Sequence, residues 1–112
     1  MASLSNRETN QKLFQEIKDI SDAYFYALEV IKGNKSQFLS DIKKNNEEYQ
    51  DFVRRVQTAF HSLDYVEQTF INNDFFYEAY AHWWSKIYSK SSYYRLRLKS
   101  MKHFKEAIDN AY

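Results

Sequence analysis

The sequence predicts an all-α protein, and three properties of the chain favour that fold class. One glycine and no proline occur in 112 residues, whereas folds with many strands need both residues for their turns. Apolar residues recur at three- and four-residue steps along most of the chain, which is the spacing of amphipathic helices. Aromatic residues make up 19% of the chain, so a few helices can build one core from large side chains.

The first predicted helix covers residues 6–32 and ends at the only glycine of the chain. Gly33-Asn34 predicts this end because both residues tolerate the left-handed conformation of a helix C-cap. Ser36 then starts the second helix. The apolar face of the first helix comprises Leu13, Phe14, Ile17, Ile20, Tyr24, Ala27, Leu28 and Ile31.

The second predicted helix extends to about residue 60, and its short connection to the first predicts an antiparallel hairpin over residues 1–60. Asn45 and Asn46 interrupt its apolar stripe, so the helix either continues through them or breaks near residues 44–46. The hairpin is either scaffold only or a surface for dimerisation or a protein partner. The apolar positions of the second helix are Phe38, Leu39, Ile42, Tyr49, Phe52, Val53, Val56 and Phe60.

After residue 60 the spacing predicts two short helices, a tight connection and one longer helix. Ser62-Leu63-Asp64 offers an N-cap for a helix up to Ile71, and Asn72-Asn73-Asp74 indicates a turn or a frayed end. Residues 76–87 form the second short helix, and residues 88–91 supply hydroxyls that cap the last helix, over residues 91–111. The predicted inner face of that last helix comprises Tyr93, Leu96, Ser100, Phe104 and Ile108.

Positive charge is concentrated in the last third of the chain. Residues 1–78 contain 9 basic and 13 acidic side chains, a net charge of −4, whereas residues 79–112 contain 7 basic and 2 acidic side chains, a net charge of +5. The whole chain carries only +1. A basic surface confined to one element is typical of proteins that bind the phosphate backbone of nucleic acids. The alternative is a basic helix face that only meets solvent.

Two short helices and a tight turn that lead into a longer basic helix follow the helix-turn-helix plan, in which the last helix enters the DNA major groove. Arg95 is nearer the expected DNA-facing side. Arg97 either reaches a phosphate from the flank or lays its stem over the edge of the core. Tyr93 belongs to the core stripe, and Tyr94 points outward. The predicted DNA-binding residues are Lys86, Lys90, Ser91, Ser92, Tyr94, Arg95, Arg97, Lys99 and Lys102.

Two stretches of this region carry a family resemblance. They are Ser62-Leu63-Asp64-Tyr65-Val66-Glu67 and Ser89-Lys90-Ser91-Ser92-Tyr93-Tyr94-Arg95-Leu96-Arg97. With these motifs, residues 62–108 resemble the C-terminal helix-turn-helix, region 4, of sigma-70-type factors, which reads the −35 promoter element. The small sigma-like regulators of phages, low-GC Gram-positive bacteria and mollicutes, including the ArpU/RinA-type phage regulators, are the most similar. The chain departs from their pattern at Trp83-Trp84, where small residues are usual, and at Ile87-Tyr88, where a glycine is usual.

The resemblance implies a sequence-specific DNA-binding regulator of transcription without catalytic activity. Residues 61–112 are then the DNA-binding unit and residues 1–60 serve dimerisation or partner contact, within one compact domain. The implied partners are double-stranded DNA, RNA polymerase and a second copy of the chain in a homodimer. Nothing before Phe60 resembles the sigma region that binds the −10 element, so a complete sigma factor is not predicted. The alternative is an all-helical protein–protein interaction module whose basic C-terminal helix is a solvated face.

Enzymatic and metal-binding functions have no motif in this sequence. The chain has no cysteine, which excludes disulfides, thiolate metal sites and a cysteine nucleophile. His61, His82 and His103 are too scattered for a metal site, and there is no phosphate-binding loop or nucleophile elbow. We therefore expect no enzyme, metal or cofactor. Without a signal pattern or an apolar run of about 20 residues, we expect a soluble cytoplasmic protein.

Overall fold

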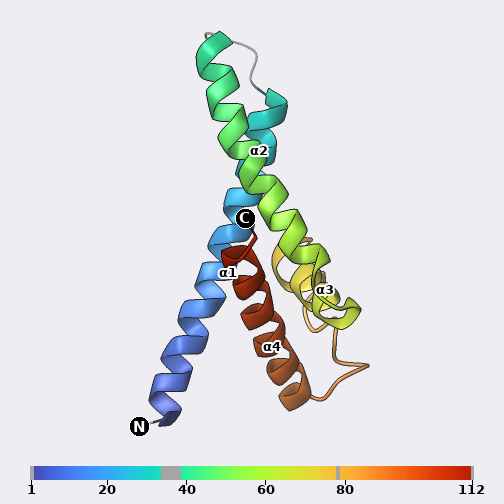
Figure 1. Ribbon diagram of the computed structural model, residues 1–112. Coiled ribbons are helices and arrows are strands. Elements are labelled where there is room, and N and C mark those ends of the chain that lie inside the picture. Colours follow the sequence, from blue (N-terminus) through green and yellow to red (C-terminus); the bar gives the residue numbers. More distant parts are fainter. Residues whose placement is uncertain (1, 34–38, 78, 112) are drawn as a thin grey trace.

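The computed structural model of this chain describes the backbone of residues 2–33, 39–77 and 79–111, and the side chains of residues 10–33, 46–77 and 79–111. These residues form four α-helices and one π-helix, with no strand among them (Figure 1). The predicted all-α fold class is therefore confirmed. None of the helices in these ranges has a stretch long and apolar enough to cross a membrane.

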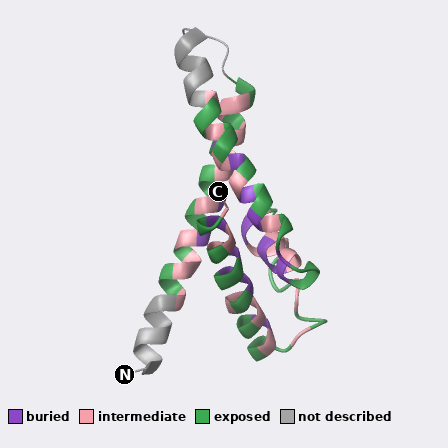
Figure 2. Cartoon of the chain, viewed as in Figure 1, coloured by how far each residue is buried: buried purple, intermediate pink, exposed green. Residues whose placement is uncertain are grey.

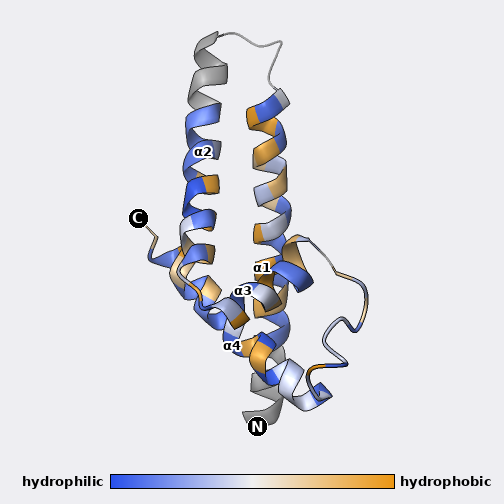
Figure 3. Ribbon diagram, turned by 90° about the vertical axis from the view of Figure 1, so that its right-hand side faces the viewer, coloured by the Kyte–Doolittle hydropathy of each residue, from blue (hydrophilic) through white to orange (hydrophobic). Residues whose placement is uncertain are grey.

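Two long helices, α1 (Ala2–Gly33) and α2 (Leu39–His61), run antiparallel and lie side by side (Figure 1, Figure 3). Gly33 is the last residue of α1, but it does not have a positive φ. The helix thus ends at the predicted glycine, but Gly33 itself does not adopt the left-handed conformation that it tolerates. Asn34 and Ser36, the other predicted boundary residues, lie outside the described residues.

The second helix, α2, continues through Asn45 and Asn46 without a break. An asparagine in a helix interior costs only about 0.7 kcal/mol relative to alanine, so packing along the rest of the helix outweighs it. The side chains of Phe38, Leu39 and Ile42 lie outside the described residues. Further along the predicted stripe, the side chains of Val53 and Val56 are buried.

The short helix α3 (Tyr65–Ile71) begins where the sequence predicts because Asp64 caps it. The Asp64 carboxylate accepts a hydrogen bond from the Glu67 N–H over 2.8 Å, and the Glu67 carboxylate accepts one from the Asp64 N–H over 3.2 Å. This capping box satisfies N–H groups that the start of a helix leaves without partners. Glu67 is buried, and its second carboxylate oxygen pairs with His103 of the last helix, so the cap also joins two helices.

A π-helix, η1 (Asn72–Phe76), follows α3 in place of the predicted turn at residues 72–74. The Tyr77 N–H donates to the Asn72 carbonyl over 2.8 Å, which closes the wider turn of this helix type. The buried Ser21 hydroxyl of α1 donates to the Phe75 carbonyl over 2.5 Å. The prediction of a turn or frayed end was wrong because such contacts with α1 hold these residues in a helical path.

The second short helix predicted over residues 76–87 is absent from the described residues, which form successive turns from Ala81 to Ile87. His82 has a φ of 60°, a left-handed conformation that interrupts an α-helix. Trp83 and Trp84 both pack on Tyr93, at 6.3 and 4.3 Å between ring centroids. Consecutive side chains of a helix point about 100° apart, so a helix would keep the two tryptophan rings from contacting the same tyrosine. The observed turns bring both rings to Tyr93.

The last helix, α4 (Lys90–Asp109), contacts α1, α2 and α3. Ser89 is its N-cap, and the Ser89 hydroxyl oxygen accepts a hydrogen bond from the Ser92 N–H over 3.2 Å, as the capping hydroxyls predict. Leu96 is only half-buried, whereas Met101, which the prediction omitted, is buried. The predicted inner-face residues that are buried are Tyr93, Ser100, Phe104 and Ile108.

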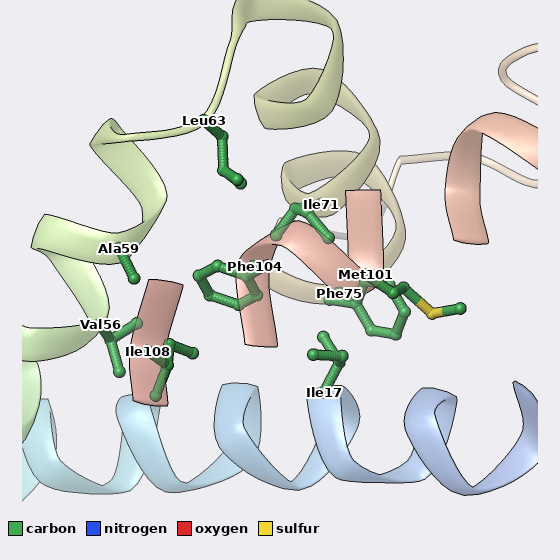
Figure 4. Packing of buried hydrophobic residues seen from close by; sticks show 9 residues of the cluster. All are labelled: Ile17, Val56, Ala59, Leu63, Ile71, Phe75, Met101, Phe104 and Ile108. Atoms are coloured by element: carbon green, nitrogen blue, oxygen red, sulfur yellow. The ribbon is translucent and has the colours of Figure 1, made fainter. Parts of the chain in front are cut away.

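One hydrophobic core joins the hairpin to the C-terminal elements. Figure 2 shows buried residues concentrated where α2, α3 and α4 meet. In Figure 4, Ile17 of α1 points toward Phe75 and Phe104, while Val56 of α2 lies beside Ile108. This packing fixes α4 from one side and leaves its other side to solvent. The core cluster comprises Ile17, Val56, Ala59, Leu63, Ile71, Phe75, Met101, Phe104 and Ile108.

Candidate nucleic-acid interface

The outer side of α4 carries a row of exposed residues that we call the basic face: Ser91, Arg95, Lys99 and Lys102. They are three or four positions apart, so they share one side of the helix. The opposite side of α4 is buried in the core. At 1.5 Å per residue, the basic face covers about 16 Å of the helix axis.

Two further predicted residues, Lys86 and Lys90, lie at the N-terminal end of α4. Lys86 is in the turns that precede the helix and Lys90 is its first residue, and both are exposed. The first turn of α4 contains no acidic residue. Because the N-terminus of a helix carries a positive partial charge, positive potential adds up at this end.

The cations of this region have no acidic partner among the described residues. Lys86, Lys90, Arg95, Lys99 and Lys102 form neither an ion pair nor a side-chain hydrogen bond there. At the other end of α4 the situation differs, since the Lys105 ammonium pairs with the Asp109 carboxylate over 2.8 Å. None of the described carboxylates therefore neutralises the charges near the basic face.

The two predicted serines of the first turn have different surroundings. Ser91 is exposed on the basic face, and its hydroxyl oxygen lies 3.4 Å from that of Ser89. Ser92 is half-buried, and its hydroxyl oxygen accepts a hydrogen bond from the Ser89 hydroxyl over 3.0 Å. Ser92 thus belongs to the N-cap, and Ser91 is the serine that the basic face presents.

Arg97 lies apart from the basic face, on the side of α4 that faces α1. Its guanidinium carbon is 5.0 Å from the ring centroid of Phe14, 5.0 Å from that of Tyr94 and 5.6 Å from that of Tyr93. These are cation–π distances. Tyr94 itself is 46% exposed and stands at the boundary between the buried side of α4 and solvent.

Tyr93 anchors the start of α4 to the preceding segments. Its hydroxyl donates to the Asp74 carboxylate over 2.5 Å, and the same carboxylate accepts a hydrogen bond from the Trp83 indole over 2.8 Å. Burial, reinforced by the hydrogen bond to Asp74, raises the pKa of Tyr93 to about 12, although the nearby Arg97 charge opposes the rise. The Trp84 ring stacks on Tyr93 with an interplanar angle of 12°. Both tryptophans therefore support the base of the candidate interface.

Sequence reasoning missed two sets of side-chain contacts that hold α4 in place. The link from Asp74 to Trp83 and Tyr93 had no local signal, because its members are far apart in the chain and meet only after folding. The sequence predicts only one of the two contacts of Glu67. Asp64 followed three residues later by Glu67 is typical of a capping box, but nothing in the sequence points to His103.

The structure offers no metal centre in its described part. No group of three or more histidine, aspartate or glutamate side chains there is arranged to hold a metal ion. His61 and His82 are exposed, and His103 pairs with Glu67. The chemistry of the region is that of exposed cations, hydroxyls and an aromatic ring.

Comparison with known proteins adds no relative: no protein-family model, curated protein or solved structure matches this chain. The function is therefore argued from the site itself.

Proposed function

We propose that this chain binds double-stranded DNA and acts as a non-catalytic regulator of transcription. One observation carries the proposal: the exposed cations at α4 have no acidic partner among the described residues. A solvated surface helix usually interleaves charges of both signs, whereas the stretch from Ala79 to Lys105 contains no acid. The proposed phosphate-binding residues are Lys86, Lys90, Arg95, Lys99 and Lys102.

Binding of this kind needs no bond chemistry. Each lysine or arginine that meets a phosphate releases condensed counterions, and this release supplies affinity independent of sequence. Ser91 and Arg95, in the N-terminal half of α4, are the residues that we assign to base edges, because hydroxyls and guanidinium groups hydrogen-bond there. Tyr94 contacts the sugar–phosphate backbone or a thymine methyl group at the border of the surface.

The run Ser89–Arg97 supports a role in transcription through its resemblance to sigma region 4. The segment before α4 differs from a helix-turn-helix, since it consists of turns anchored by Trp83 and Trp84. In our proposal α4 enters the groove as a helix supported by that aromatic anchor. The hairpin of α1 and α2 then serves homodimerisation or contact with RNA polymerase.

Fluorescence anisotropy with a mixed pool of duplex DNA, at about 50 to about 200 mM salt, tests the proposal. Five engaged cations predict that log affinity falls with log salt at a slope of about −4 to −5. The double charge reversal K90E/R95E removes two of these contacts and introduces repulsion, so we expect binding to disappear.

A matched control reverses the same number of charges elsewhere. Lys18 and Lys32 are exposed residues of α1, and K18E/K32E changes the net charge as much as K90E/R95E does. We expect this control to retain most of the binding. A DNA affinity that does not change with salt would contradict a DNA-binding surface on α4. An equal loss of affinity in both double variants would contradict it as well.

A second candidate function, protein–protein interaction, is favoured by apolar side chains that are exposed in the segment preceding α4. Tyr77, Tyr80 and Ile87 are 67%, 77% and 69% exposed, and exposed aromatic residues often anchor interfaces. Light scattering of the purified chain distinguishes this function. Self-association that Y80A/I87A abolishes and K90E/R95E leaves intact supports the interaction module.

A further inference from the structure

Arg97 is held by aromatic rings in place of an acid. Its guanidinium carbon lies within 5.0 Å of the ring centroids of both Phe14 and Tyr94. No ion pair forms between Arg97 and a described residue, and its Nε atom is buried without a hydrogen-bond partner. The side chain is therefore fixed between α1 and α4 by cation–π contacts.

Folding explains an arginine at this position only in part: its cation–π contacts are favourable, but its Nε atom is buried without a hydrogen-bond partner. A buried N–H group without a partner costs free energy, and an apolar side chain of similar length, such as methionine, fills the same space without that cost. The charged residue is therefore better explained by what it does to its neighbours than by stability.

We infer that Arg97 is a positioning residue: it ties Tyr94, at the border of the basic face, to Phe14 of α1, and it orients this part of α4 for DNA without contacting DNA. The inference rests on the proposed function. Tyr94 and Arg97 are three positions apart and so are neighbours on the helix surface. Phe14 belongs to α1, so the contact also makes the DNA-facing helix depend on the position of α1.

The placement of Arg97 argues against a direct phosphate contact. Arg95 and Arg97 are two residues apart, which puts them about 200° apart around the helix. A duplex that lies along Arg95 and Lys99 meets the outer side of α4, whereas the Arg97 guanidinium faces Phe14. The salt dependence of binding separates the two roles, because only a residue that contacts phosphate contributes to the slope.

The test compares R97M, F14L and the double variant F14L/R97M with R95M as the matched control, all in the full chain, by anisotropy with the same DNA pool. We expect R97M to weaken binding about five- to tenfold with an unchanged salt slope, while the chain stays folded and keeps a cooperative thermal transition. F14L weakens binding in the same direction, and the double variant is no weaker than R97M. R95M lowers the magnitude of the slope by about 0.9.

Two results in DNA binding overturn the inference. If R97M lowers the magnitude of the salt slope by about 0.9 and F14L binds DNA with wild-type affinity, Arg97 is a direct phosphate ligand. Wild-type affinity in R97M removes any role in positioning.

A measurement without DNA keeps the inference separate from the proposed function. In ¹⁵N NMR spectra of the full chain, the Arg97 Nε–H signal should be displaced by ring currents and should move in F14L. If this signal stays in place in F14L, the contact itself is refuted, whether or not DNA binds. Absence of DNA binding by the wild-type chain instead refutes the proposed function, and with it the positioning role.

Discussion

Tyr93 is the residue on which the contacts at the start of α4 converge. Its ring stacks on Trp84 at 4.3 Å and on Phe70 at 5.7 Å between centroids. Its hydroxyl donates to Asp74, and the guanidinium carbon of Arg97 lies 5.6 Å from the centroid of its ring. Such ring pairs add stability beyond the area they bury. A single side chain thus joins α3, the turns before α4, and α4 itself.

The raised pKa of Tyr93 predicts a measurable pH dependence. The pKa is 10.0 in its ordinary state and about 12 in the folded chain, so folding favours the protonated phenol. The stability that this group contributes is complete below pH 10 and is lost as the pH rises from about 10 to about 12. Absorbance titration at the tyrosinate band should show one late transition that Y93F removes.

The variant D74N serves as a control for the cause of this shift. Without the Asp74 carboxylate the late transition moves toward lower pH, but burial keeps it above the ordinary value. A titration curve that Y93F and D74N both leave unchanged contradicts the assigned role of Tyr93.

Glu67 combines a helix cap with a hydrogen bond to His103, and two variants separate these roles. E67A removes both and should lower the free energy of unfolding by about 1–3 kcal/mol. E67Q keeps an amide oxygen for the Asp64 N–H and loses only the charge opposite His103, so its cost is about 1 kcal/mol or less. Urea unfolding measures both values. E106A, at an exposed position of α4, is the control and should change stability by about 0.5 kcal/mol at most.

At the scale of elements, spacing predicts the helices well and the turns poorly. The predicted helix beginning at Tyr65 is confirmed, and among the capping hydroxyls predicted over residues 88–91 that of Ser89 caps α4. Both features depend on neighbours within four residues. The helix predicted over residues 76–87 fails, although its apolar residues have helical spacing. There the two tryptophans bind one tyrosine of another element, and the sequence does not display that partner.

The left-handed residue of this segment provides a test of the turn. His82 has a φ of 60°, which glycine adopts without the steric cost that other residues incur. H82G should therefore raise the free energy of unfolding by about 0.5–1 kcal/mol. The neighbouring variant A81G, at a residue without positive φ, should lower it by up to about 1 kcal/mol. If urea unfolding gives the same sign for both variants, the assigned conformation is wrong.

At the scale of the whole molecule, the hairpin and the C-terminal elements share one core, but the hairpin extends beyond it. The radius of gyration is 16.5 Å and the longest dimension is 52 Å, whereas a compact chain of this length has a radius near 13 Å. The long α1 and α2 account for the difference, because they extend beyond the shared core (Figure 1). The protein thus combines a packed centre with a projecting helix pair.

The shared core predicts that the C-terminal elements cannot fold alone. Phe104 and Ile108 of α4 pack in one cluster with Ile17, Val56 and Ala59 of the hairpin, and a fragment of residues 61–112 exposes that surface to water. Circular dichroism of the fragment should show little helix and no cooperative thermal transition. The full chain should unfold in one transition. A fragment that melts cooperatively would show that its own contacts suffice.

The sequence by itself determined the all-α class, most helix boundaries, most of the inner face of α4 and the concentration of basic residues near its start. These follow from local rules: turn residues are scarce, apolar spacing is helical, and acids are missing from one stretch. Only the tertiary structure decided that Arg97 faces Phe14, that residues 81–87 form turns, and that α1 and α2 complete the core around α4. The physical reason is that these features depend on contacts between residues far apart in the chain, whose energies override local preference.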